Sequence, residues 1–144
     1  MIRTLAALVL AAGLVSCGQP GPGVVIEDAQ FRPPLGSTGI GVGYFTIRSD
    51  KADRIIAVSS PEADSIEIHA SVTTGGNVSM QKLDGVDLPP GKTVGFESGG
   101  MHLMVFSPRI SGEALTFPIT IELQSGAKPT TLFHVITGGA DHHG

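Results

Sequence analysis

Two histidines and two methionines have the residue types and the spacing of a metal site. His102 and Met104 are two residues apart, so in a β-strand both side chains point to one face while their neighbours in the sequence point toward the core. Met80 precedes His102 by 21 intervening residues, and His69 precedes Met80 by ten. Thioethers are neutral, soft ligands that favour Cu(I), whereas magnesium, calcium and manganese prefer oxygen. If the four side chains converge, they form a Cu(I) site.

Other metal-binding and charged side chains have plainer interpretations. Met101 alternates with the core-facing residues of its strand, so we interpret it as packing. His134 lies inside the last predicted strand, far in sequence from other ligand types, and is interpreted as a structural histidine with satisfied hydrogen bonds. Glu67 and Asp64 are interpreted as charges on a solvated face. No serine, histidine and carboxylate arrangement indicates hydrolytic chemistry.

The chain ends in a short polar segment with two adjacent histidines, His142 and His143. Imidazole suits oxidised copper, and no methionine follows Thr137. We therefore consider the tail, residues 138–144, a candidate second site for Cu(II), alongside the alternative that it is only a solvated end.

The beginning of the chain is typical of a targeting segment. Arg3 is followed by an apolar run too short to span a bilayer, and the stretch 14–17, Leu-Val-Ser-Cys, resembles a bacterial lipobox. We expect residues 1–16 to be a lipoprotein signal peptide and Cys17 to carry the lipid. The alternative is an ordinary secretory signal. Cys17 is the only cysteine, which excludes an internal disulfide and any cysteine-ligated copper or zinc site in this chain.

Composition excludes a further class of function. Of 144 residues, 41% are hydrophobic and 15% charged, and the net charge of −4 comes without a basic cluster. Binding to nucleic acid requires a basic footprint, so we discard it. A chain of this length forms one domain with a single core.

The predicted secondary structure is entirely β. The Gly/Pro-rich residues 17–23 are expected to form a flexible tether before a domain at 24–137, and no segment of that domain shows sustained helical periodicity. Short apolar or alternating runs separated by turn signals indicate a β-sandwich of about eight to ten strands. The expected strands are 24–26, 40–47, 54–59, 64–72, 78–83, 86–88, 93–96, 101–106, 115–123 and 130–137.

The pattern His-x10-Met-x21-His-x-Met resembles the signature of the periplasmic copper chaperones of the PCuAC family. The likeness extends over about residues 26–135 and includes the turn at 89–91 and the approach at 99–104. It implies a single-domain, cupredoxin-like or immunoglobulin-like Greek-key β-sandwich that binds one Cu(I) through His69, Met80, His102 and Met104 at an exposed end. Ala70 departs from the methionine or acidic residue that many members carry there.

The resemblance also implies a function. Such a protein is not an enzyme but delivers copper to a cuproenzyme, with the Cu(A) subunit of cytochrome c oxidase and Sco-type copper proteins as expected partners. We expect a periplasmic lipoprotein, anchored in the outer rather than the inner membrane because no acidic residue follows Cys17. Two alternatives stay open: a copper-dependent redox enzyme, which would need more histidines than the domain supplies, and a structural envelope lipoprotein without metal.

Overall fold

The computed structural model describes residues 23–137, which form ten β-strands and no helix. The predicted signal peptide at 1–16, the tether up to residue 22 and the tail at 138–144 lie outside the described residues, as do Cys17, His142 and His143. No membrane-spanning helix is found within 23–137. The strands are β1 (Val24–Arg32), β2 (Ile40–Ser49), β3 (Asp53–Ser59), β4 (Ser65–Thr74), β5 (Asn77–Leu83), β6 (Val86–Leu88), β7 (Thr93–Phe96), β8 (Met101–Phe106), β9 (Thr116–Leu123) and β10 (Thr130–Val135).

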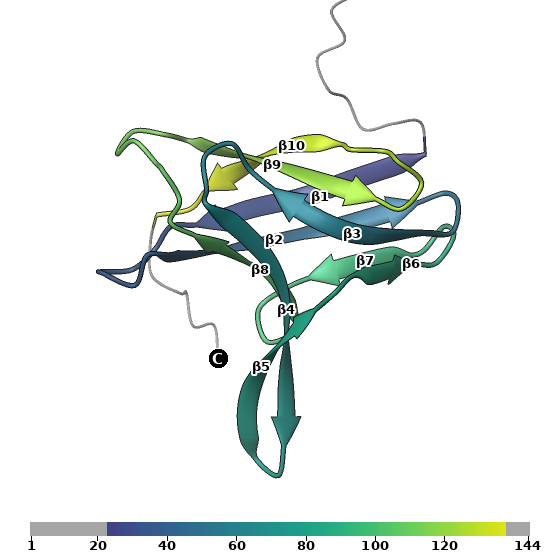
Figure 1. Ribbon diagram of the computed structural model, residues 1–144, viewed down its shortest axis with the longest axis horizontal. Helices are drawn as coiled ribbons and strands as arrows, with labels where there is room; N and C mark the ends of the chain where they lie inside the picture. The colour runs from purple at the N-terminus through teal and green to yellow at the C-terminus, as the bar shows by residue number, and fades with distance from the viewer. Residues whose placement is uncertain (1–22, 138–144) are drawn as a thin grey trace, which may run out of the picture.

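The strands belong to one mixed sheet in the order β5-β4-β8-β2-β1-β10-β9-β3-β6, with β7 paired to β2 beside this path (Figure 1). All pairs are antiparallel except β1 with β10, which run parallel. The sheet bends, and its two halves face each other across a shared core. The expected all-β class and single domain are confirmed.

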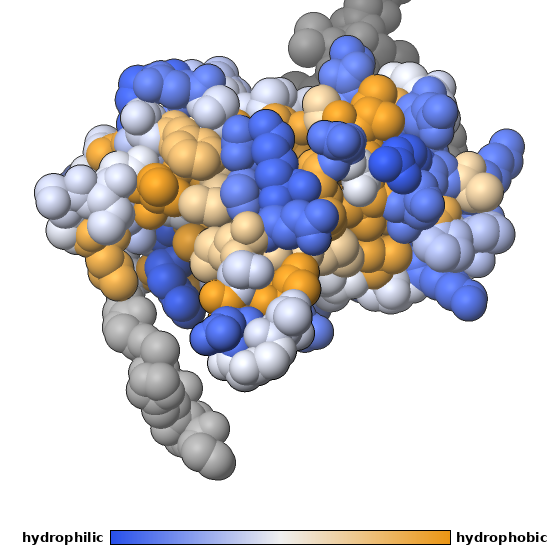
Figure 2. Space-filling model, turned by 60° about the horizontal axis from the view of Figure 1, so that its bottom comes forward, coloured by the Kyte–Doolittle hydropathy of each residue, from blue (hydrophilic) through white to orange (hydrophobic). Residues whose placement is uncertain are grey.

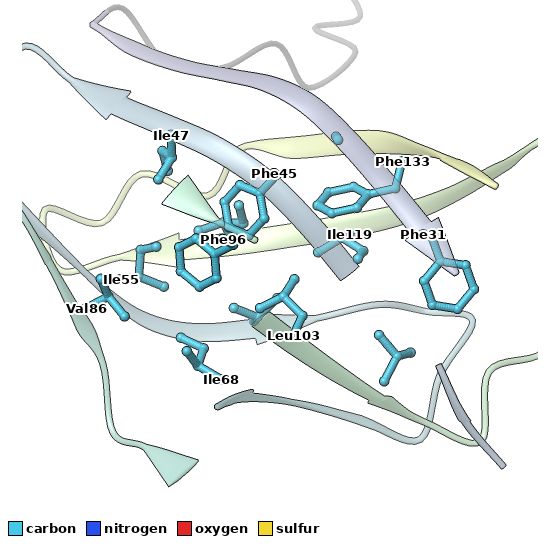
Figure 3. Close-up of a cluster of buried hydrophobic side chains, with 14 of the residues drawn as sticks. Phe31, Phe45, Ile47, Ile55, Ile68, Val86, Phe96, Leu103, Ile119 and Phe133 are labelled. Atoms are coloured by element: carbon cyan, nitrogen blue, oxygen red, sulfur yellow. The ribbon is translucent and has the colours of Figure 1, made fainter. Parts of the chain in front are cut away.

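Aromatic and branched side chains from both halves fill this core (Figure 3). Phe31 stacks on Phe117 with ring centroids 4.4 Å apart, and Phe45 stacks on Phe96 at 4.3 Å. Phe45 also meets Phe133 edge-on at 5.6 Å. Such aromatic pairs contribute roughly 0.5–1.5 kcal/mol each beyond the apolar area that they bury. The core therefore ties the first strands of the chain to the last.

Strand β1 is longer than predicted. The sequence indicates a strand at 24–26, but β1 continues to Arg32. A bulge between Glu27 and Gln30 shifts the register with β2, and the pairing resumes after it. Asp28 has a φ of 53° at this bulge. The extra residue breaks the alternation by which a strand is recognised in sequence.

Strand β2 pairs with two different strands along one edge, β8 and β7. Its first half pairs with β8 and its second half with β7. Gly41 is required here, because a Cβ atom would lie 2.6 Å from the Phe31 ring. The close approach of the strand to Phe31 explains why a glycine stands near the start of β2.

Strands β4 and β5 form a hairpin, here called the arm, that projects from the body of the domain (Figure 1). Its turn uses Gly75 and Gly76, both with positive φ as hairpin turns of this type require. The turn signal in the sequence is confirmed. Every residue of β5 except Leu83 is exposed, and Val78 and Met80 are the exposed large apolar side chains of this strand. Figure 2 turns this side of the molecule forward and shows apolar and hydrophilic patches side by side.

Asp53 joins the start of β3 to the turn after β9. Its Oδ1 accepts hydrogen bonds from the backbone amides of Arg54 at 2.8 Å and Ser125 at 3.1 Å. Burial alone would raise the pKa of the Asp53 carboxyl, but the hydrogen bonds from Ser125 and Arg54 hold that pKa below its ordinary value.

Candidate metal centre

The pairing of β4 with β8 places His69 directly opposite His102. Their neighbours Ile68 and Leu103, also a pair, are 5% and 0% exposed in the core, so the two histidines lie on the other face of the sheet. The imidazole centroids are 6.2 Å apart and the ring planes make an angle of 29°. This confirms the prediction that His69 points away from the core.

Each imidazole has one nitrogen that forms a hydrogen bond and one that does not. His69 Nε2 lies 2.9 Å from Glu67 Oε2, and His102 Nδ1 lies 3.2 Å from the carbonyl oxygen of Gly100. His69 Nδ1 and His102 Nε2 are buried and have no hydrogen-bond partner among the described residues. Buried polar atoms are nearly always satisfied, so two such atoms on facing rings indicate a ligand.

The two methionines lie on the same face as the histidines but in different surroundings. Met104 is two residues from His102, stands opposite Glu67, and is half-buried. Met80 on β5 stands opposite Ser71 of β4, two pairs further along the arm than the pair of His69 with Lys82, and is 62% exposed. The structure therefore brings His69, His102 and Met104 together on β4 and β8, and it places Met80 on the neighbouring strand β5.

Glu67 belongs to this site, contrary to its interpretation as a solvated charge. Its two carboxylate oxygens contact different groups, Oε2 the His69 ring and Oε1 the Lys82 ammonium at 2.7 Å. Hydrogen bonds from Lys82 first, and then from His69, hold the pKa of the Glu67 carboxyl below its ordinary value. The sequence did contain a signal, because Glu67 alternates onto the His69 face and the hairpin register puts Lys82 opposite His69.

The remaining candidates lie elsewhere. Met101 packs against the core, as predicted. His134 is exposed on β10 rather than a satisfied structural histidine, because Phe133 takes the inward position of that strand. Asp64 is 65% exposed and pairs with Arg109, as expected for a surface charge. Residues 23–137 contain no group of three or more His, Cys, Asp or Glu side chains placed to hold a metal ion.

The available donors fit a soft metal ion. Two imidazole nitrogens without a hydrogen-bond partner among the described residues lie on paired strands, one thioether lies two residues from His102, and a second thioether lies further along the same face. Metal–imidazole bonds are about 2.0–2.1 Å long in zinc sites, so two rings whose centres are 6.2 Å apart have room for one ion between them. The set combines intermediate and soft ligands without a charged donor, as Cu(I) prefers.

The curled β-sheet with this face defines a domain of the PCuAC fold. The structure is similar to the copper-bound PCuAC domain from PmoF2, with a TM-score of 0.67 and 21% identity over 83% of this chain and 97% of that domain. It is also similar to apo-DR1885 from Deinococcus radiodurans (TM-score 0.61, 19% identity, 96% of this chain and 95% of that one). For the Cu(I) form of DR1885 the TM-score is 0.59 at 23% identity, over 81% and 80% of the two chains.

The chain belongs to the LpqE-like family, whose model, described as "Putative lipoprotein LpqE-like", matches residues 24–135. No curated protein matches the sequence. The resemblance to PCuAC domains expected from the spacing of histidine and methionine is confirmed.

Proposed function

We propose that this protein is a non-enzymatic Cu(I) carrier that holds one ion through His69, His102, Met104 and Met80. The observation that supports this most is the pair of buried, unpartnered ring nitrogens on facing strands. The fold is that of domains solved with copper bound, as in PmoF2 and DR1885.

The arrangement suits both capture and release. His102 is 5% exposed and fixed on a central strand, whereas Met80 is 62% exposed on the arm. A ligand that solvent and a partner can reach is the one that an incoming donor can displace. Protons compete with copper for the imidazoles but not for the thioethers, so Cu(I) affinity should weaken on acidification.

The test is a Cu(I) titration of the purified protein combined with X-ray absorption. We expect one Cu(I) with both nitrogen and sulfur in its coordination shell. Met104→Leu should remove a sulfur scatterer. Met101→Leu is the matched control, because it removes a thioether three residues away that packs against the core. No Cu(I) binding by the parent protein would favour the alternative of a structural lipoprotein without metal.

For the recipient, we propose the Cu(A) subunit of cytochrome c oxidase, with Sco-type copper proteins acting alongside. The likeness to PCuAC domains supports this assignment. Mixing the Cu(I)-loaded protein with an apo Cu(A) domain should transfer the metal, which can be followed by the Cu(A) absorption after oxidation. Turnover of superoxide or another substrate by the loaded protein would instead favour a redox enzyme.

We also propose that the carrier works in the periplasm, attached through Cys17 to the outer membrane. The lipobox-like stretch at 14–17 and membership of a family described as lipoproteins support the anchor. Separation of inner and outer membranes by density, followed by detection of the protein, tests the choice of membrane.

A further inference from the structure

Hydrogen-bond chemistry determines which nitrogen of each histidine is protonated in this site. An ionised carboxylate only accepts hydrogen bonds, so the contact of 2.9 Å between Glu67 Oε2 and His69 Nε2 requires a proton on Nε2. A backbone carbonyl also only accepts, so the 3.2 Å contact with Gly100 requires a proton on His102 Nδ1. In the neutral rings, the lone pairs are therefore on His69 Nδ1 and His102 Nε2.

These two nitrogens are the two that have no partner. His69 Nδ1 and His102 Nε2 are both buried without a hydrogen bond among the described residues. The acceptor beside each ring thus fixes the proton on one nitrogen, and the other nitrogen of the same ring is buried with a free lone pair. One histidine is directed by a side chain and the other by the backbone.

We propose that Glu67 is a positioning residue that makes His69 bind Cu(I) through Nδ1, while His102 binds through Nε2. This inference rests on the proposed Cu(I) site. Glu67 does not need to contact the metal. It holds the Nε2–H of His69 and thereby fixes both the tautomer and the orientation of the ring, as outer-shell carboxylates do for metal-bound histidines.

Lys82 contacts the second carboxylate oxygen of Glu67. It lies on β5 opposite His69 and reaches diagonally to Glu67, with Nζ 2.7 Å from Oε1. The other carboxylate oxygen is the one that faces His69. The contacts from Lys82 to Glu67 and from Glu67 to His69 therefore run from β5 to β4, and they connect the strand that carries Met80 to the tautomer of His69.

The first experiment measures tautomers in the metal-free protein. Long-range proton–nitrogen NMR of the full chain with labelled histidine should show His69 as the Nε2–H form and His102 as the Nδ1–H form. In Glu67→Ala, His69 should become a mixture of both tautomers. In Lys82→Met the acceptor is still present, so His69 should keep the Nε2–H form.

The second experiment measures Cu(I) affinity by competition with a chelator. Glu67→Ala should weaken binding by about ten- to a hundredfold, as loss of an outer-shell carboxylate typically does. Glu122→Ala is the matched control, because Glu122 forms a similar pair with Lys128, at 3.1 Å, on β9 away from the site. This control should bind with parental affinity.

The outcomes separate this inference from the proposed function. A parent protein that binds Cu(I) but has His69 in the Nδ1–H form overturns the role of Glu67 alone, as does a Glu67→Ala protein with unchanged tautomer and affinity. A parent that binds no Cu(I) overturns the carrier and the role of Glu67 toward copper together. If Glu67→Ala does not fold, the tautomers of the parent still decide.

Discussion

Replacing His102 by leucine should stabilise the metal-free protein while removing a proposed copper ligand. His102 is 5% exposed, and its Nε2 is buried with no partner in the described part of the chain. A polar group buried without a hydrogen bond costs about 1–3 kcal/mol. Leucine has similar bulk and no such atom, so the free energy of unfolding should rise.

The change also removes one hydrogen bond, which sets the size of the effect. The bond from His102 Nδ1 to the Gly100 carbonyl is worth about 0.5–1.5 kcal/mol. That carbonyl still accepts from the amide of Ser71 at 3.1 Å, so the substitution leaves no orphaned acceptor. The difference is a net stabilisation of about 1 kcal/mol, which raises the melting temperature of a domain of this size by roughly 3–6 °C.

The assay is thermal and urea unfolding in the presence of a copper chelator, with Cu(I) affinity measured separately. Leu103→Ala is the control, because Leu103 is the next residue on β8 but is fully buried in the core. It should lose about 2–5 kcal/mol of stability, and its folded fraction should still bind Cu(I). The reasoning is refuted if His102→Leu is less stable than the parent, or if it keeps the parent's affinity for Cu(I).

The remaining predictions address other parts of the chain. Met104→Leu should reduce the preference for Cu(I) over Cu(II) without loss of fold, and Met80→Leu should mainly speed release of Cu(I) to a chelator, measured by stopped flow. Cys17→Ala should leave the membrane fraction; unchanged fractionation and processed mass would contradict the anchor. Truncation after Thr137 should remove Cu(II) binding and leave one Cu(I), and calorimetry that shows unchanged Cu(II) binding would count against a tail site. The lowered pKa of Asp53 contributes stability that is present at neutral pH and lost as pH falls through that pKa, so Asp53→Asn should flatten the acid side of the curve of unfolding free energy against pH.

Simple alternation was sufficient to predict the faces of the site strands. Ile68 and Leu103 lie on the core face of the sheet, and His69, His102 and Met104 lie on the opposite face. A period of two requires this when one face packs on a core. The hairpin that connects β4 to β5 was equally accessible, because its two glycines match a turn with positive φ at both central positions.

Features that depend on contacts distant in sequence were not predictable. The continuation of β1 past Asp28 is stabilised by β2 and β10, and no local pattern marks it. Glu67 looked like a surface charge because its second partner, the Lys82 ammonium, reaches it only when β5 folds back on β4, although His69 lies two residues away on the same strand. His134 is exposed because its neighbour Phe133 packs into the core. Which of the two residues points inward depends on the core contacts of Phe133 and not on the local sequence of the strand.

The parallel pairing of β1 with β10 has a consequence for how this chain folds. In the described residues it is the one strand pairing between the half of the sheet that holds β4 and β8 and the half formed by β9, β3 and β6. It joins strands from nearly opposite ends of the chain, a long-range contact of the kind that makes folding slow. All four candidate ligands precede β9 in the sequence, so a nascent or C-terminally cleaved chain has every copper donor but cannot close the sheet. We expect such a chain to be cleaved by proteases rather than to act as a weaker carrier.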